Sequence, residues 1–160
     1  MDAAREHGFH ALSVVDVVDE TADAKTLVFD VPGALAEVFR YRAGQFCNVR
    51  VTIGGEEVVR CYSMSSAPSV DDRLAVTVKR VEGGLVSNWL HDHVRPGTVL
   101  EVSKPSGHFV ARDGAAGPLV LCCGGSGVTP VFSLAKECLA TSDRPIRMTL
   151  DSRQPAPLSK

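Results

Sequence analysis

Alternation of apolar and polar residues dominates the chain from Phe9 to about Arg112 and predicts β-structure. The strictest alternation covers Phe46 to Ile53, and a Gly54-Gly55 turn leads from it into Glu56 to Tyr62, which indicates a hairpin. The other expected strands are Ala11 to Val18, Thr26 to Val31, Leu74 to Val81 and Thr98 to Val102. Six short strands at this spacing predict a mainly β fold with a small closed or nearly closed barrel.

Two short helical segments interrupt the predicted strands. Ala34 to Phe39 is long enough for about one turn and a half. Val86 to His91 places Trp89 and Leu90 on one side of a second helix. Ser87 stands near its start, where a serine is a favourable N-cap.

The periodicity changes after a Gly- and Ala-rich linker at residues 113–117. Leu119 to Cys123 is a continuous apolar run, typical of a parallel strand buried on both faces. A Gly-rich turn follows, and a helix is expected to begin at Pro130, since proline suits the first helical position. Ile146 to Leu150 can form the next parallel strand and complete one β–α–β unit.

Composition and charge narrow the function classes. Lys and Arg number 17 and Asp and Glu 19, and the net charge of −2 gives no reason to expect nucleic acid. No apolar run reaches the roughly 18 residues of a membrane span. The polar segment Met1 to His10 lacks a signal-peptide core. The five cysteines are odd in number and irregularly spaced, which favours a reducing, cytoplasmic setting over a disulfide framework.

Neither the cysteines nor the histidines are spaced for a metal ion. The Cys-x4-Cys-x2-Cys run of a plant-type iron–sulfur cluster is absent from the sequence. Cys122 and Cys123 lie in an apolar run and are expected to be buried thiols. His91 and His93 are expected to face solvent from a loop, and two histidines are too few for a site. No metal is therefore expected in this chain.

Arg60 and Tyr62 fall on one face of a predicted strand, because side chains alternate along a strand. A guanidinium can hold phosphate through two parallel hydrogen bonds. The neighbouring aromatic ring can cover a planar ring system. By themselves the two residues fit a surface or partner contact as well as a ligand site.

Two glycine-rich segments precede predicted helices. Gly83 and Gly84 let backbone N–H groups approach an anion, although a plain cap by Ser87 explains them locally. Gly124 to Pro130 joins a strand to a helix, without the Lys of a phosphate-binding loop. Pro130 stands where a dinucleotide fingerprint has its third glycine. A plain glycine-rich connection explains this second segment as well as a ligand site does.

Taken in order, these segments resemble the motifs of the ferredoxin–NAD(P)H reductase superfamily. The chain matches its Arg-x-Tyr-Ser/Thr flavin motif, its Gly-x-x-Ser pyrophosphate motif, its Pro-x-Gly-x-Phe closing segment and the start of its nicotinamide domain. The matching segments are Arg60-Cys61-Tyr62-Ser63, Gly84-Leu85-Val86-Ser87, Pro105-Ser106-Gly107-His108-Phe109 and Gly124 to Pro130. Tyr41 to Phe46 and Val78 to Val81 are most similar to reductase components of bacterial oxygenases, of the 3-ketosteroid 9-alpha-hydroxylase and phenylacetyl-CoA oxygenase type.

The resemblance implies a six-stranded antiparallel Greek-key barrel with a short helix. It also implies an FAD site in this barrel and assigns the residues of that site. Ser63 and Thr129 take catalytic positions beside the flavin, where an incoming nicotinamide arrives. The implied cofactor-binding residues are Arg60, Cys61, Tyr62, Ser63, Val78, Lys79, Gly84, Val86, Ser87, Gly125, Gly127 and Thr129. Arg60 and Ser87 would hold the pyrophosphate, and Tyr62 would pack on the flavin.

The resemblance also implies an activity and a domain division. NAD(P)H would give a hydride to FAD, which would pass electrons to an iron–sulfur protein or an oxygenase component. The implied units are an FAD-binding barrel at 8–112, a linker at 113–117, a partial NAD(P)-binding domain at 118–150 and a tail at 151–160. A C-terminally truncated chain is expected, without an iron–sulfur cluster and with weak or lost nicotinamide binding.

Alternatives to an active reductase stay open. The chain can be completed by another subunit, or serve as a flavin-binding module without turnover. A barrel used for protein contacts, without flavin, is the plainest alternative.

Overall fold

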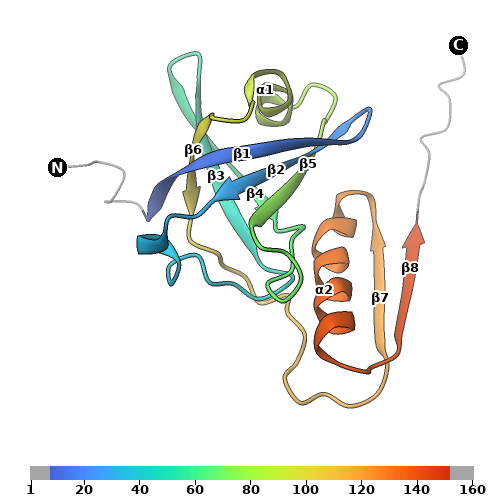
Figure 1. Ribbon diagram of the computed structural model, residues 1–160. Helices are drawn as coiled ribbons and strands as arrows, with labels where there is room; N and C mark the ends of the chain where they lie inside the picture. Colours follow the sequence, from blue (N-terminus) through green and yellow to red (C-terminus); the bar gives the residue numbers. More distant parts are fainter. Residues whose placement is uncertain (1–7, 152–160) are drawn as a thin grey trace, which may run out of the picture.

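The structure is a computed structural model that describes residues 8–151, so the expected tail lies outside the described residues except for Asp151. Six antiparallel strands pair in the order β4-β3-β6-β1-β2-β5. They are β1 (Phe9–Thr21), β2 (Ala24–Asp30), β3 (Phe46–Ile53), β4 (Glu56–Ser63), β5 (Leu74–Lys79) and β6 (Val99–Ser103). A bridge between Met64 and Val76 joins the two outer strands, so the sheet closes into a barrel (Figure 1). The mainly β, six-stranded antiparallel fold is confirmed.

The barrel core follows from the alternation of side chains along each strand. Every second side chain along a strand points inward, and the apolar side chains at the centre of the barrel are fully buried. This set includes Leu12, Val14, Leu27, Phe29, Val49, Val76 and Val102. Most of the strand limits expected from the sequence lie within a few residues of the observed ones.

The hairpin of β1 and β2 is longer than the apolar pattern predicts. Its far end pairs polar residues, and Lys25 forms an ion pair with Asp19 at 3.4 Å. Backbone pairing and polar contacts extend the ladder where apolar alternation has already stopped. The helix expected at Ala34 to Phe39 is wrong in kind, since only a short 3-10 turn (η2, Gly33–Leu35) forms there.

Helix α1 (Leu85–His93) covers one opening of the barrel, and Val86 and Leu90 are buried in the barrel core. Two expectations are corrected here. Gly84, not Ser87, is the N-cap, so Ser87 lies within the first turn. His91 does not face solvent: it is 4% exposed, and its Nε2 lies 2.8 Å from the carbonyl oxygen of Val78.

The second part of the chain is a small parallel unit. It consists of β7 (Leu119–Gly124), a 3-10 turn η3 (Gly125–Gly127), α2 (Val128–Thr141) and β8 (Ile146–Asp151). Helix α2 stands between the barrel and the two strands (Figure 1). Because α2 begins at Val128, Pro130 occupies the third helical position instead of the first. Its missing N–H is still harmless there, because the first turn of a helix leaves its N–H groups without helical partners.

The strand β7 is not buried on both faces, which corrects the expectation. Helix α2 covers one face of the two-stranded sheet, where Leu121 is 5% exposed. On the other face Val120 is 60% exposed, and Cys122 is an exposed thiol. No helix within residues 8–151 has the length and apolar character needed to cross a membrane.

Candidate functional site

Arg60 and Tyr62 lie on one face of β4, as the alternation predicts. They stand opposite Val49 and Cys47 of β3, whose side chains are fully buried, so this is the core-facing side of the strand. Tyr62 packs against the barrel core, whereas Arg60 is exposed at the margin. Arg60 donates one hydrogen bond to the carbonyl oxygen of Val59 at 2.8 Å, and its guanidinium keeps further N–H groups for a ligand.

Partial burial raises the pKa of Tyr62 to about 12, while the nearby positive charge of Arg60 lowers it. The phenol therefore stays neutral over the physiological range. Its apolar ring faces the core region beside Arg60. This combination of a charge and a neutral aromatic ring suits a ligand that carries both phosphate and a planar ring.

Helix α1 packs against both β4, the strand of Arg60 and Tyr62, and β5. No side chain caps this helix, and its first turn contains no acidic residue. Gly84 has no room for a side chain, since a Cβ there would lie 2.6 Å from Ser87 Oγ. No capping side chain and no carboxylate of the first turn therefore competes with an anion for the backbone N–H groups at the helix start.

Ser87 is 8% exposed, and its Oγ accepts a hydrogen bond from the backbone N–H of Val81 at 3.1 Å. The hydroxyl proton of Ser87 remains available for donation. Val78 points into the core, and its carbonyl oxygen contacts His91. Lys79 is exposed and forms an ion pair with Asp23 at 3.3 Å. The Val78 side chain and the Lys79 ammonium group are thus both engaged within the protein.

Cys61 and Ser63 lie on the other face of β4. The thiol of Cys61 donates to Asn48 Oδ1 at 2.8 Å, so its side chain points away from Arg60. Beyond the strand end, Met64 is fully buried and points inward, with Ser63 and Ser65 on either side of it in the chain. Ser63 is paired with Phe46 across the ladder, on the outer side of the barrel.

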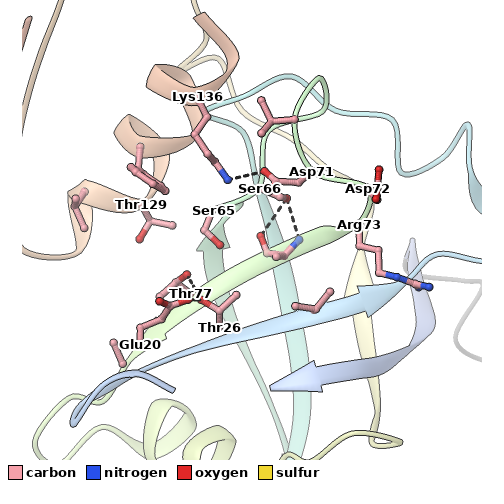
Figure 2. A pocket seen from close by; sticks show the side chains of 16 residues that line it. Glu20, Thr26, Ser65, Ser66, Asp71, Asp72, Arg73, Thr77, Thr129 and Lys136 are labelled. Atoms are coloured by element: carbon pink, nitrogen blue, oxygen red, sulfur yellow. Dashed lines mark hydrogen bonds and ion pairs between the residues drawn. The ribbon is translucent and has the colours of Figure 1, made fainter. Parts of the chain in front are cut away.

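A cleft of about 780 Å³ separates the outer face of β2 and β5 from α2 (Figure 2). Thr129 lines it from the first turn of α2, and Ser65 lines it from the segment after β4. Ser63 is not among the lining residues, and within residues 8–151 no hydrogen bond joins Ser63 to Thr129. The structure thus brings Thr129 to the barrel and leaves Ser63 at the strand end that leads to the cleft.

Polar contacts hold α2 against the barrel and shape this cleft. Ser133 is fully buried and donates from Oγ to the carbonyl oxygen of Ser66 at 2.6 Å. Lys136 forms an ion pair with Asp71. Glu137 accepts a hydrogen bond from the hydroxyl of Ser69 at 2.7 Å. The segment that follows β4 therefore positions the glycine-rich turn and Thr129.

The glycine-rich turn brings two chain segments close together. A Cβ at Gly124 would lie 3.2 Å from the carbonyl oxygen of Asp151. Gly125 has a φ of 54°, a left-handed conformation that favours glycine. Gly127 is the N-cap of α2, which has no side-chain cap. This turn can admit a ligand near Thr129 at the helix start.

The sequence pattern does not indicate a row of hydroxyl groups along the cleft. Thr26 Oγ1 donates to Glu20 Oε1 at 2.7 Å and lies 2.7 Å from Thr77 Oγ1. Ser65 Oγ has no hydrogen-bond partner and is the only such buried side-chain N or O atom among residues 8–151. The alternation of Leu74, Val76 and Val78 does place Thr77 on the outer face of its strand, but it cannot show what covers that face.

These observations fit a dinucleotide that carries a planar ring. Arg60 and the uncapped start of α1 offer phosphate donors, Tyr62 offers an aromatic surface, and Ser65 supplies an unused hydroxyl in the neighbouring cleft. An empty cap position and an orphaned buried hydroxyl are the two features that need a partner from outside the chain.

Comparisons with known proteins show the family of the chain. Residues 11–110 match the family described as oxidoreductase FAD-binding domain. The ferredoxin reductase component of 3-ketosteroid-9-alpha-monooxygenase from Mycolicibacterium smegmatis is 48% identical over 133 residues, which are 81% of this chain and 37% of that protein. One component of 1,2-phenylacetyl-CoA epoxidase from Escherichia coli is 38% identical over 135 residues, which are 83% of this chain and 38% of that protein.

A solved structure, phthalate dioxygenase reductase, superposes with a TM-score of 0.78 and 25% identity, and the match covers 96% of this chain and 46% of that one. The chain thus spans less than two fifths of the length of the two relatives it matches. The expected likeness to oxygenase reductase components is confirmed. Because the family match covers more than half of its residues, the chain belongs to the oxidoreductase FAD-binding domain family.

Proposed function

We propose that the chain is the FAD-binding part of an electron-transfer reductase that takes electrons from NAD(P)H and delivers them to an iron–sulfur protein or an oxygenase component. The observations that carry the proposal are the Arg60 guanidinium on β4, which keeps free N–H groups, and helix α1, which packs against β4 and has no side-chain cap. Two phosphate-binding elements beside Tyr62 suit a flavin dinucleotide better than a protein partner.

In this proposal Arg60 binds the pyrophosphate through its free N–H groups, and the first-turn backbone of α1 at Val86 and Ser87 binds it from the other side. Gly84 is required because a side chain there would collide with Ser87. Tyr62 orients the flavin by packing on it, while Val78 and Lys79 contact the cofactor through backbone. Cys61 belongs to this site by its position on β4, although its thiol is directed to Asn48.

Ser63 and Thr129 take the reactive side of the proposed site. Both lie toward the outer side of the barrel, where α2 approaches and where water can be excluded. Gly125 and Gly127 carry no side chains, so the turn before Thr129 leaves room for a nicotinamide to approach. FAD, when bound, supplies the redox chemistry, and the protein holds and orients the reacting groups.

The proposed units are an FAD-binding barrel at 8–112, a linker at 113–117 and part of an NAD(P)-binding domain at 118–150. Phthalate dioxygenase reductase is described as transferring electrons from pyridine nucleotides to a [2Fe-2S] centre, which supports the same direction of flow here. The two relatives above are components of different oxygenase systems, so the final substrate stays open.

A second candidate is a flavin-binding module without turnover. It is favoured by the two-stranded sheet of β7 and β8, whose face away from α2 is exposed at Val120 and Cys122. Anaerobic addition of NADH to the FAD-loaded chain separates the two functions. Bleaching of the flavin absorbance supports the reductase, and unchanged absorbance with FAD bound supports the module.

The phosphate role of Arg60 has a direct test. Arg60→Ala should weaken FAD binding by about 1.5–3 kcal/mol, the scale of a hydrogen bond to a charged group. The dissociation constant measured by flavin fluorescence should therefore rise by about 10-fold to 150-fold. Arg40→Ala is the matched control, because Arg40 is an exposed arginine that pairs with Glu37. Equal FAD affinities of Arg60→Ala and the unmodified chain would remove Arg60 from the site.

A further inference from the structure

The cleft between the barrel and α2 contains a hydrogen-bond chain with a fixed direction. Glu20 carries a carboxylate, which can only accept, so the single hydroxyl proton of Thr26 goes to Glu20. The 2.7 Å contact between Thr26 and Thr77 must then use the proton of Thr77. Thr77 Oγ1 is left with lone pairs alone. It therefore presents a hydrogen-bond acceptor on the cleft wall.

Ser65 lines the same cleft as this acceptor and has the opposite character. Its backbone N–H donates to the carbonyl oxygen of Ala75 at 2.9 Å, which places it beside the strand residue two positions before Thr77. Its Oγ is shielded from solvent and has no partner within residues 8–151. A buried hydroxyl without a partner costs about 1–3 kcal/mol. Ser65 is therefore a donor that gains from a group supplied at the cleft.

The hydroxyl group of the neighbouring Ser66 has hydrogen-bond partners, in contrast to that of Ser65. Ser66 Oγ accepts from the backbone N–H of Ala75 at 2.9 Å and contacts the hydroxyl of Tyr41 at 2.6 Å. The two adjacent serines therefore differ in the hydrogen bonding of their hydroxyl groups. Ser66 ties the segment to the barrel, whereas the hydroxyl of Ser65 is unused.

The α2 wall of the cleft contains two exposed apolar side chains beside Thr129 and Lys136. Phe132 is 50% exposed and Val128 is 37% exposed, and both line the cleft. Lys136 Nζ lies 5.3 Å from the centroid of the Phe132 ring. A cleft that combines exposed apolar side chains with polar groups suits a planar ring that carries polar groups along its rim.

We propose that Ser65 and Thr77 form a donor–acceptor pair that recognises the amide edge of a planar heterocycle. Ser65 donates to a carbonyl oxygen, and Thr77 accepts from the adjacent N–H. The chain from Thr77 through Thr26 to Glu20 keeps Thr77 in its acceptor state. The proposal rests on the proposed flavin function, and it adds two residues that the superfamily motifs do not include.

Two ring systems of that function share this chemistry. The isoalloxazine carries an imide edge, and the nicotinamide carries a carboxamide. Ser65→Ala and Thr77→Val remove the donor and the acceptor one at a time. Thr77→Ser keeps the hydroxyl group and should therefore bind the ring as tightly as the unmodified chain does. Thr52→Val is the matched control, because Thr52 is an exposed strand threonine outside the cleft.

The experiment titrates the purified full chain and each variant with FAD, with lumiflavin and, after FAD loading, with NAD⁺. If the isoalloxazine is recognised, Ser65→Ala and Thr77→Val raise the dissociation constants of FAD and lumiflavin by a similar factor of about ten, or 1.4 kcal/mol. If the nicotinamide is recognised, the affinity for FAD stays constant and that for NAD⁺ falls by the same factor. Both results support the amide-edge pair and identify its source.

Three results would overturn it. In the first, the wild-type chain binds FAD, and Ser65→Ala and Thr77→Val bind FAD, lumiflavin and NAD⁺ as tightly as the wild-type chain does. The donor–acceptor pair is then wrong, and the proposed function stands. In the second, the wild-type chain binds no FAD, and both the donor–acceptor pair and the proposed function are then wrong. The third is thermal: without ligand, Ser65→Ala should unfold at the same or a higher temperature, because it loses an unpartnered hydroxyl. A clear loss of stability would assign Ser65 a purely structural role.

Discussion

The barrel and the β7–α2–β8 unit differ in how completely each buries its own apolar surface. The barrel closes on itself and has a continuous core from all six strands and α1. The second unit has a small core around Leu121, Val131 and Leu134. Ala43, from the barrel segment before β3, also packs into this core. Val120 on the outer face of the unit is 60% exposed. The barrel can hold a ligand by its own stability, whereas the second unit relies on its contacts with the barrel.

This difference separates the two halves of the proposed site. Arg60, Tyr62 and the start of α1 belong to the closed barrel. Thr129 and the wall of the cleft belong to α2, whose position depends on Ser133 and its neighbours. Binding of the dinucleotide is therefore expected to be robust, and the geometry at the cleft is expected to be the sensitive part.

The largest expected effect contrasts one core position of the barrel with an exposed position of α2. Phe29 is fully buried and Leu139 is 71% exposed. Phe29→Ala should lower the free energy of unfolding by about 3–5 kcal/mol through loss of buried contacts and a cavity. Leu139→Ala should change it by less than about 0.5 kcal/mol. Urea unfolding of both variants checks this, and similar losses would contradict the contrast between the two regions.

An intermediate effect is expected at the contact between the two regions. Ser133→Ala removes the buried hydrogen bond to the carbonyl oxygen of Ser66, at a cost of about 1–2 kcal/mol. Hydrogen exchange should become faster in α2 and β7, with little change in the barrel strands. Thr141→Ala is the control, since its hydroxyl bonds to Glu137 within the same helix on an exposed face. Equal acceleration throughout the barrel would show that the two regions open as one.

The smallest expected effect concerns the alkaline limit of the barrel. Burial raises the pKa of Tyr62 and of Tyr41 to about 12 from an ordinary value of 10.0. The folded chain therefore keeps these protons where the unfolded chain loses them, so stability is present below pH 10 and falls between pH 10 and about 12. Tyr62→Phe should make the fall shallower in unfolding experiments across that range. An unchanged slope would show that Tyr62 titrates alike in both states.

The sequence predicts the barrel well because alternation is a local property of each strand. The hairpin of β3 and β4 lies where the pattern and the Gly54-Gly55 turn place it. What covers a strand is not local. The apolar run around Cys122 predicts a buried thiol, but Cys122 is exposed because no element among the described residues covers that face of β7.

The candidate site divides in the same way. Arg60 and Tyr62 are predicted to share a face, since they are two positions apart, which is one full repeat of a strand. Ser65, Thr77 and Glu20 come from three distant segments that only barrel closure and the β1–β2 hairpin bring to one cleft. No single stretch of sequence carries that arrangement, so it could be found only in the folded chain.

The most direct test of the account is hydrogen exchange of the full chain with and without FAD. We expect slower exchange at the end of β4 around Arg60 to Ser63 and in the first turn of α1 around Gly84 to Ser87. The remote hairpin end at Gly54 and Gly55 should be unaffected. Saturable FAD binding without protection of these two segments, or no binding at all, would contradict the assignment of the cofactor site.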